Sequence, residues 1–177
     1  MTCKIAIRDI VIQEANDQGV PPAIALAVAT KETRLQHWRP DGSVITAGND
    51  NGTTDVGVMQ LNSNTSPLLG VDPYDLYDNI HGGVKYLRQL YDKYGDWQMA
   101  VERYNGKGPK ARAYAATVMS IAGGFNIALT MASQCADRTG STGSAPAFAA
   151  LPSLPQSKLL LAGAAIGGVG LALLALA

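Results

Sequence analysis

The spacing of apolar positions predicts a chain built mostly of helices. Apolar residues recur at helical intervals over residues 7–15, and Gly19 would end this first helix. A second helix would begin at Pro22, since proline suits the first helical position, where no N–H is needed. Residues 23–29 of this helix are all apolar. Because a surface helix carries a polar face, the second helix is expected to be enclosed by the rest of its domain.

Helical spacing returns in the second half of the chain. Residues 79–93 carry apolar side chains at steps of three and four, with Asp78 as the candidate N-cap. The same spacing covers residues 97–104, and the glycines and proline of residues 106–109 interrupt it. A further helix is expected over residues 110–133. Its apolar part is short for a bilayer span, so this helix is expected to pack in the core.

One stretch after the second helix has the character of β structure. Residues 44–46 and 53–56 are rich in β-branched side chains. Turn-forming residues precede each of them, at positions 39–42 and 48–52. We therefore expect a small β-hairpin or irregular flap, followed by a polar loop. The predicted fold class is mostly α, with this flap as its β region.

Composition divides the chain into three parts. Residues 1–133 form the predicted folded domain. Residues 134–157 are rich in Ser, Thr, Gly, Ala and Pro, which is typical of a flexible linker. Residues 158–177 are apolar apart from Lys158, and a helix over the nineteen apolar residues 159–177 would span about 28 Å, close to the hydrocarbon thickness of a bilayer. We expect a single C-terminal transmembrane helix, with an apolar tail buried by a partner as the alternative.

Charge and composition exclude several classes of function. Lys and Arg number 14, as do Asp and Glu, so no basic surface points to a nucleic-acid partner. His37 and His81 are the two histidines, and no Cys/His/acid spacing fits zinc, so neither metal nor cofactor is expected. Cys3 and Cys135 are expected to be buried thiols, or to pair if the two ends of the domain meet. Charges interrupt the N-terminal apolar stretch, so it is not a signal peptide.

Glu32 is the candidate for acid catalysis. It stands where the apolar run of the second helix gives way to polar residues. A carboxyl group there would lie at the wall of a cleft, partly dehydrated and near the negative end of the helix dipole, and both effects raise its pKa. A general acid that works near neutral pH needs this environment. The alternative is a solvated glutamate, which is what we expect of Glu14 and Glu102.

Three blocks of sequence stand in a fixed order around this glutamate. They are AVATKET at residues 27–33, DVGVMQLN at residues 55–62 and ERYNG at residues 102–106. Their order resembles the lytic transglycosylase domain of the lysozyme-like superfamily, whose signatures are an A-x-x-E-[ST] helix end, a G-[LIV]-M-Q-[LI] turn and a Y-N-x-G helix end. The resemblance covers residues 5–122 and implies an α+β lysozyme-like fold, in which the flap lies beside the active-site cleft.

The resemblance implies roles for particular side chains. Glu32 would be the single general acid and base, and six residues would bind the saccharide, with the glycine, methionine and glutamine on the groove floor. These six are Thr33, Gly57, Met59, Gln60, Tyr104 and Asn105. The tyrosine and asparagine would lie beside the glutamate, and the threonine replaces the serine of many members. Taken singly, each has an ordinary structural explanation, as Met59 has in core packing.

Asp55 is a candidate second carboxylate. Residues 49–63 also resemble the catalytic flap of c-type lysozymes, in which an aspartate two residues before the glycine acts as nucleophile or charge stabiliser. Retaining glycosidases place two carboxyl groups about 5 Å apart. The alternative is a turn residue that bonds to its local backbone.

The function implied by the resemblance is cleavage of peptidoglycan between N-acetylmuramic acid and N-acetylglucosamine, closing a 1,6-anhydro ring. A muramidase that uses Asp55 for hydrolysis is the alternative, and a non-catalytic glycan-binding membrane protein is the rival from another class. The expected partners are glycan strands, a membrane, and proteins of a virion or secretion machine. With no export signal, we expect the protein to ride in a phage particle with an internal membrane and to act in the host periplasm during genome delivery.

Overall fold

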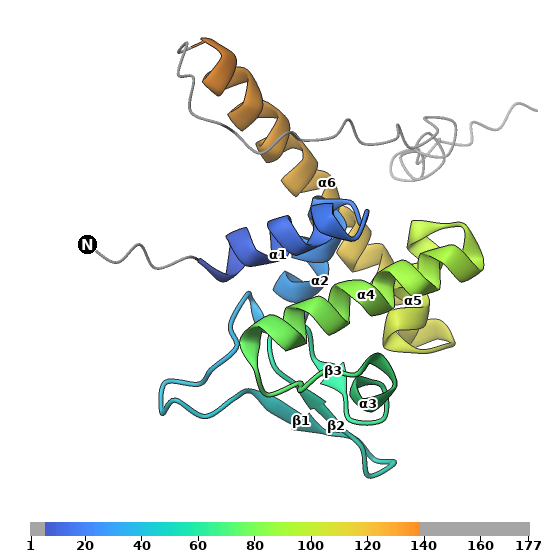
Figure 1. The fold of residues 1–177 in the computed structure, drawn as a ribbon. Coiled ribbons are helices and arrows are strands. Elements are labelled where there is room, and N and C mark those ends of the chain that lie inside the picture. The colour runs from blue at the N-terminus through green and yellow to red at the C-terminus, as the bar shows by residue number, and fades with distance from the viewer. Residues whose placement is uncertain (1–5, 139–177) are drawn as a thin grey trace, which may run out of the picture. The chain divides into compact units, whose positions relative to one another are not determined.

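Helices dominate residues 6–138, the part of the chain that the computed structural model describes, with side chains described to residue 130 (Figure 1). The mostly helical, lysozyme-like fold class predicted from the sequence is confirmed. In chain order the elements are α1 (Ile7–Asp17), α2 (Pro22–Thr33), β1 (Thr46–Gly48), β2 (Thr54–Val56), β3 (Leu61–Asn62), α3 (Ser66–Leu69), α4 (Leu76–Tyr94), α5 (Trp97–Asn105) and α6 (Pro109–Arg138).

The helices predicted within residues 6–138 are all present, but the start of α4 differs from the prediction. Its N-cap is Asp75 and not Asp78, because the Asp75 side chain accepts hydrogen bonds from the backbone N–H groups of Tyr77 and Asp78. The Asp75 backbone is extended, as a capping residue requires. The polar loop before α4 also contains the short helix α3, which the proline-rich sequence did not reveal.

The flap is a three-stranded antiparallel sheet in the order β1-β2-β3. Thr46 pairs with Val56, and Val56 in turn pairs with Leu61. The prediction located two strands but placed the first one too early, because Val44 makes only an isolated bridge to Trp38. The third strand has two residues, too few for an alternating pattern to be visible in sequence.

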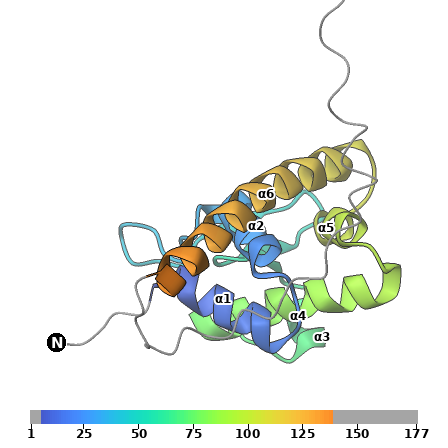
Figure 2. The same ribbon diagram turned by 90° about the horizontal axis from the view of Figure 1, so that it is seen from above.

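Helix α2 is enclosed by the helical body, as its apolar sequence predicted. Every residue from Pro22 to Ala29 is buried. The helix packs against α1 and α6, and Figure 2 shows α6 running beside it. The polar end of α2 is therefore the part that reaches the surface of the core.

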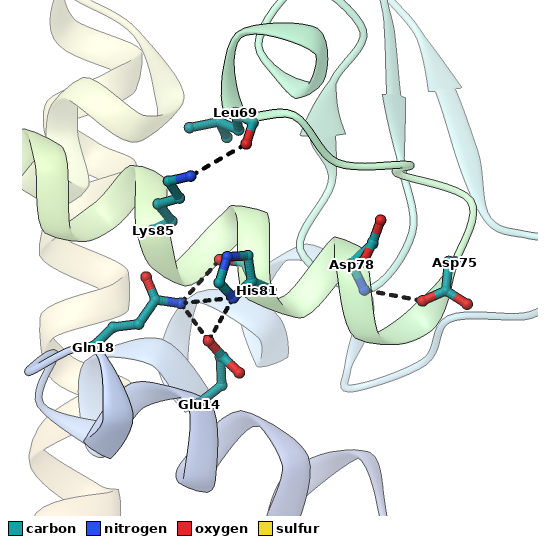
Figure 3. A network of polar contacts seen from close by, with 7 residues as sticks. All are labelled: Glu14, Gln18, Leu69, Asp75, Asp78, His81 and Lys85. Atoms are coloured by element: carbon teal, nitrogen blue, oxygen red, sulfur yellow. Dashed lines mark hydrogen bonds and ion pairs between the residues drawn. The ribbon is translucent and has the colours of Figure 1, made fainter.

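A polar network joins α1 to α4 (Figure 3). Glu14 Oε1 lies 2.8 Å from Nδ1 of His81, and the amide of Gln18 donates to the backbone oxygen of His81. On α4 as well, Lys85 donates to the Leu69 carbonyl oxygen at 3.2 Å and so ties α3 to this helix. Glu14, which was expected to be solvated, is partly exposed and also makes this contact.

Helix α6 contributes to the core through its first half. Ala111, Tyr114, Ala115, Val118 and Ala122 are buried. From Pro109 to Thr130 the helix is also long and apolar enough to cross a membrane by length and composition alone, a test that core helices pass as well. It continues to Arg138, past the predicted start of the linker at residue 134. The rest of that linker, the predicted transmembrane helix at 158–177 and Cys3 lie outside the described residues.

Candidate active site

Glu32 is the penultimate residue of α2. The helix ends directly after it because Arg34 and Leu35 adopt left-handed backbone angles, with φ of 58° and 61°. Their N–H groups bond to the carbonyl oxygens of Thr30 and Ala29, as at other helix ends that turn sharply. The carboxyl group is thus held at the rim of the core by a helix whose remaining residues are immobilised by packing.

The glutamate lines a cleft of about 410 Å³. One wall comes from the flap and the segment after it, and it is rich in amide and hydroxyl side chains. The other wall comes from Tyr86 on α4 and from the end of α5. Among the residues predicted to form the site, the cleft is lined by Glu32, Asp55, Gln60, Tyr104 and Asn105.

Burial raises the pKa of Glu32 above its ordinary value, and this is the largest effect on the group. The negative charge of Asp55 raises it further. A hydrogen bond from Tyr114 and the positive charge of Lys31 act in the opposite direction but do not cancel the effect of burial. The carboxyl group therefore keeps its proton to higher pH than a solvated glutamate, as a general acid must.

Tyr114 on α6 is the direct partner of Glu32, and sequence reasoning missed it. Its hydroxyl group donates to Glu32 Oε1 at 2.5 Å. Burial and the neighbouring carboxyl group raise the pKa of Tyr114, so its hydroxyl remains a donor. The one available signal was a phenol on the apolar stripe of α6, because a buried tyrosine hydroxyl needs a hydrogen-bond partner.

Tyr104 has a different contact from the one predicted. Its hydroxyl group donates to the Met59 carbonyl oxygen at 2.8 Å and so ties α5 to the turn between β2 and β3. Burial raises its pKa well above the ordinary value, with further contributions from Glu32, Tyr86 and Asp55, so it lies within electrostatic reach of both carboxyl groups. Asn105 ends α5 on the cleft wall.

Two buried polar side chains, His37 and Asn79, build the Gly57–Gln60 turn. His37 Nδ1 accepts the N–H of Val58 at 3.2 Å, and Asn79 accepts the N–H of Met59 at 2.9 Å. The Asn79 amide also donates to the carbonyl oxygen of Val56. Both side chains are fully buried, so these bonds satisfy groups that water cannot reach. Sequence reasoning missed both residues because neither belongs to a signature block.

Three of the residues predicted to bind substrate lie behind the cleft. The Met59 side chain is fully buried and packs against Gly83, where an added Cβ would lie 2.6 Å from it. Gly57 is buried against His37 and Asn79. The Thr33 hydroxyl donates to the Val58 carbonyl oxygen at 3.1 Å. These side chains shape the turn, and Gln60 is the member that lines the cleft.

Asp55 is held on the flap by two side-chain amides. Its Oδ2 accepts from Asn49 at 2.9 Å and its Oδ1 accepts from Asn62 at 2.7 Å. Its partners are therefore side chains from neighbouring strands and turns, in contrast to the local backbone bonding considered as the alternative. Its charge raises the pKa of Glu32, so the two carboxyl groups interact across the cleft.

A mostly helical body with a small β flap, and a proton-retaining glutamate in the cleft beside it, defines a protein of the lysozyme-like class. The family model described as "Transglycosylase SLT domain" matches residues 9–120, more than half of the chain. The chain therefore belongs to the transglycosylase SLT domain family. One signature is imperfect, because Gly106 follows Asn105 directly, without the intervening residue of Y-N-x-G.

A relative among characterised proteins comes from a bacterial virus. The protein named "Transglycosylase" of Enterobacteria phage PRD1 is 39% identical over 83 residues. The match covers 41% of this chain and 31% of that protein, so the chain spans less than a third of the relative's length.

Proposed function

We propose that this chain is a peptidoglycan lytic transglycosylase in which Glu32 is both general acid and general base. The observation that carries the proposal is a glutamate in a polar cleft whose pKa is raised by burial and whose Oε1 is fixed by Tyr114. One carboxyl oxygen is thereby anchored, and the other is left for the substrate. Membership of the transglycosylase SLT domain family supports the same reaction.

The reaction needs Glu32 to give up one proton and then to take up another. Protonated Glu32 donates to the bridging oxygen between N-acetylmuramic acid and N-acetylglucosamine, and the bond from C1 to this oxygen breaks. The acetamido carbonyl of the muramic residue stabilises the positive charge at C1. Glu32, now ionised, takes the proton of the C6 hydroxyl as its oxygen bonds to C1. The products are a 1,6-anhydro end and a free C4 hydroxyl.

A muramidase is the second candidate, and the position of Asp55 favours it. The carboxylate lies in the same cleft as Glu32, and Asn49 and Asn62 hold both of its oxygens. It could stabilise the developing charge at C1, or form a bond to it, while water completes the hydrolysis. The product would then be a reducing sugar.

Glu32→Gln tests the assignment of the acid, since the amide is close in shape and can still accept from Tyr114. We expect release of muropeptides from purified sacculi to fall at least a thousandfold with the fold retained. Retained cleavage would refute the role of Glu32. Mass analysis of the wild-type products separates an anhydro end from a reducing end.

Asp55→Asn tests the second carboxylate, with Asp50→Asn as the matched control on the same flap. Asp50 is exposed and does not line the cleft. If the protein is a transglycosylase, anhydro products persist in the Asp55 variant. If it is a muramidase, hydrolysis is lost in that variant and kept in the control.

The proposal extends to where the enzyme works. The apolar sequence of residues 158–177 supports a membrane anchor, and the phage origin of the relative supports a place in a virion with an internal membrane. We expect the full chain to co-purify with the membrane of phage particles, and a chain that ends at residue 157 to lose this association. Recovery of the full chain only from the host envelope would contradict the virion assignment.

A further inference from the structure

Arg103 is a cation on the cleft wall that the proposed chemistry does not use. It is the one Lys or Arg among the described residues that line the cleft. Its side chain is 23% exposed, so it is neither a core residue nor a freely solvated one. Burial, Tyr114, Asp55 and Lys31 account for the shifted pKa of Glu32, so the role of Arg103 lies elsewhere.

The guanidinium group is oriented by its neighbours. Nη1 donates to Glu102 Oε1 at 2.7 Å, and Cζ lies 5.7 Å from the centroid of the Tyr94 ring. Glu102 is 9% exposed, so the expectation that it lies on the surface was wrong. Its carboxyl group sits beneath the wall as the partner of Arg103, while Tyr94 supports the guanidinium from α4.

A contribution to the stability of the fold is a poor explanation for the Glu102–Arg103 ion pair. A partly exposed ion pair contributes about 0–1 kcal/mol. Taking the Glu102 carboxylate out of water costs free energy that such a pair hardly recovers. The guanidinium has five N–H donors, and within the described residues only the bond to Glu102 is formed. Donors held in a fixed plane on a cleft wall match the two oxygens of a carboxylate.

The substrate offers a carboxylate of this kind. The sugars of peptidoglycan are neutral, because the lactyl carboxyl group of muramic acid forms an amide bond to a peptide stem, and this stem carries free carboxyl groups. We propose that Arg103 binds a carboxylate of this peptide stem, so that the enzyme selects strands that carry acidic stems. This inference rests on the proposed function. It assigns the α4–α5 side of the cleft to the peptide.

The test uses two substrates that differ in charge alone. Glycan strands with intact stems are compared with the same strands after their carboxyl groups are converted to amides with carbodiimide and ammonia. We expect kcat/KM of the wild-type chain to be about tenfold higher on the charged strands, the worth of one charge-assisted hydrogen bond. Arg103→Gln should remove this preference through KM with kcat retained, and Arg103→Lys should restore part of it.

Arg112→Gln is the matched control, because Arg112 is exposed on α6 outside the cleft and should keep the wild-type preference. The dissociation constants of the charged and the amidated strands are also measured with the inactive Glu32→Gln protein, with Arg103 kept and with Arg103→Gln added. An Arg103→Gln protein that still prefers charged strands overturns the inference, as does one that loses kcat equally on both. If the wild-type chain cleaves neither substrate, the proposed function fails. The dissociation constants would still show whether Arg103 makes the protein bind charged strands more tightly than amidated ones.

Discussion

Glu32 and Tyr114 are 82 positions apart in sequence and share a hydrogen bond, which lowers the pKa of the glutamate and so opposes the effect of its burial. The sequence identified Glu32 because a long apolar run ends beside it. Tyr114 could not be identified in the same way, since its position depends on how α6 crosses α2. The burial of Glu32 could thus be predicted from the sequence of its own helix. Its hydrogen-bond partner could not, because that partner depends on how two helices pack together.

Tyr114→Phe tests how the glutamate is tuned. The hydroxyl donates to Glu32 and lowers its pKa, so its removal should raise that pKa further. In the proposed mechanism Glu32 acts in its protonated form, so the alkaline limb of the pH–rate profile should move to higher pH. We expect kcat to fall about tenfold, since Oε1 loses its anchor.

Tyr77→Phe is the control for this change, because Tyr77 is 58% exposed on α4. It should leave both the profile and kcat as in the wild-type chain. An alkaline limb that moves to lower pH in the Tyr114 variant would contradict the tuning described above.

Strained backbone conformations also occur at the site. Three non-glycine residues have positive φ within residues 6–138, namely Arg34, Leu35 and Gln60. Two of them follow Glu32, and the third lines the cleft. Each such conformation costs about 1 kcal/mol or more and persists where surrounding contacts enforce it. These positions could not be predicted from the sequence, because Arg, Leu and Gln are not residue types that favour left-handed angles.

At the scale of elements, the turn between β2 and β3 is held in place by buried side chains from two other parts of the chain. His37, from the segment after α2, and Asn79, from α4, hold its backbone from two sides. The GVMQL sequence therefore reflects the backbone conformation of this turn more than a set of substrate-binding side chains. Its glycine and methionine are both buried against neighbouring residues. Of the three residues of this turn that were predicted to bind substrate, only Gln60 lines the cleft.

Gly57→Ala tests this account of the turn. Gly57 has φ of +74°, and an added Cβ would lie 2.4 Å from the Asn79 amide and 2.7 Å from the His37 ring. Strain and displacement of both side chains should lower the free energy of unfolding by at least about 3 kcal/mol, and activity should fall with it. Urea denaturation measures the first effect.

Gly52→Ala is the matched control on the same flap. Its φ of +80° is similar, but nothing lies within 4 Å of an added Cβ. The cost should be about 1 kcal/mol, with activity retained. Equal losses in the two variants would show that the contacts of Gly57 add nothing to its backbone requirement.

At the scale of the whole molecule, local patterns predicted the helices well. The apolar runs of α1, α2, α4, α5 and α6 each fixed one element, since each buries a continuous face. The errors fell where long-range contacts override local signals. Glu102 was expected to be solvated, yet it is buried and paired with Arg103.

The burial of α2 also has a consequence for motion. A helix enclosed on all sides opens only when the domain unfolds, whereas a sheet of three short strands at the surface opens locally at far lower cost. Glu32 on α2 and Asp55 on β2 therefore lie on elements of unequal rigidity. If the protein acts on a polymer as proposed, we expect the flap that carries Asp55 to yield to it while Glu32 keeps its position.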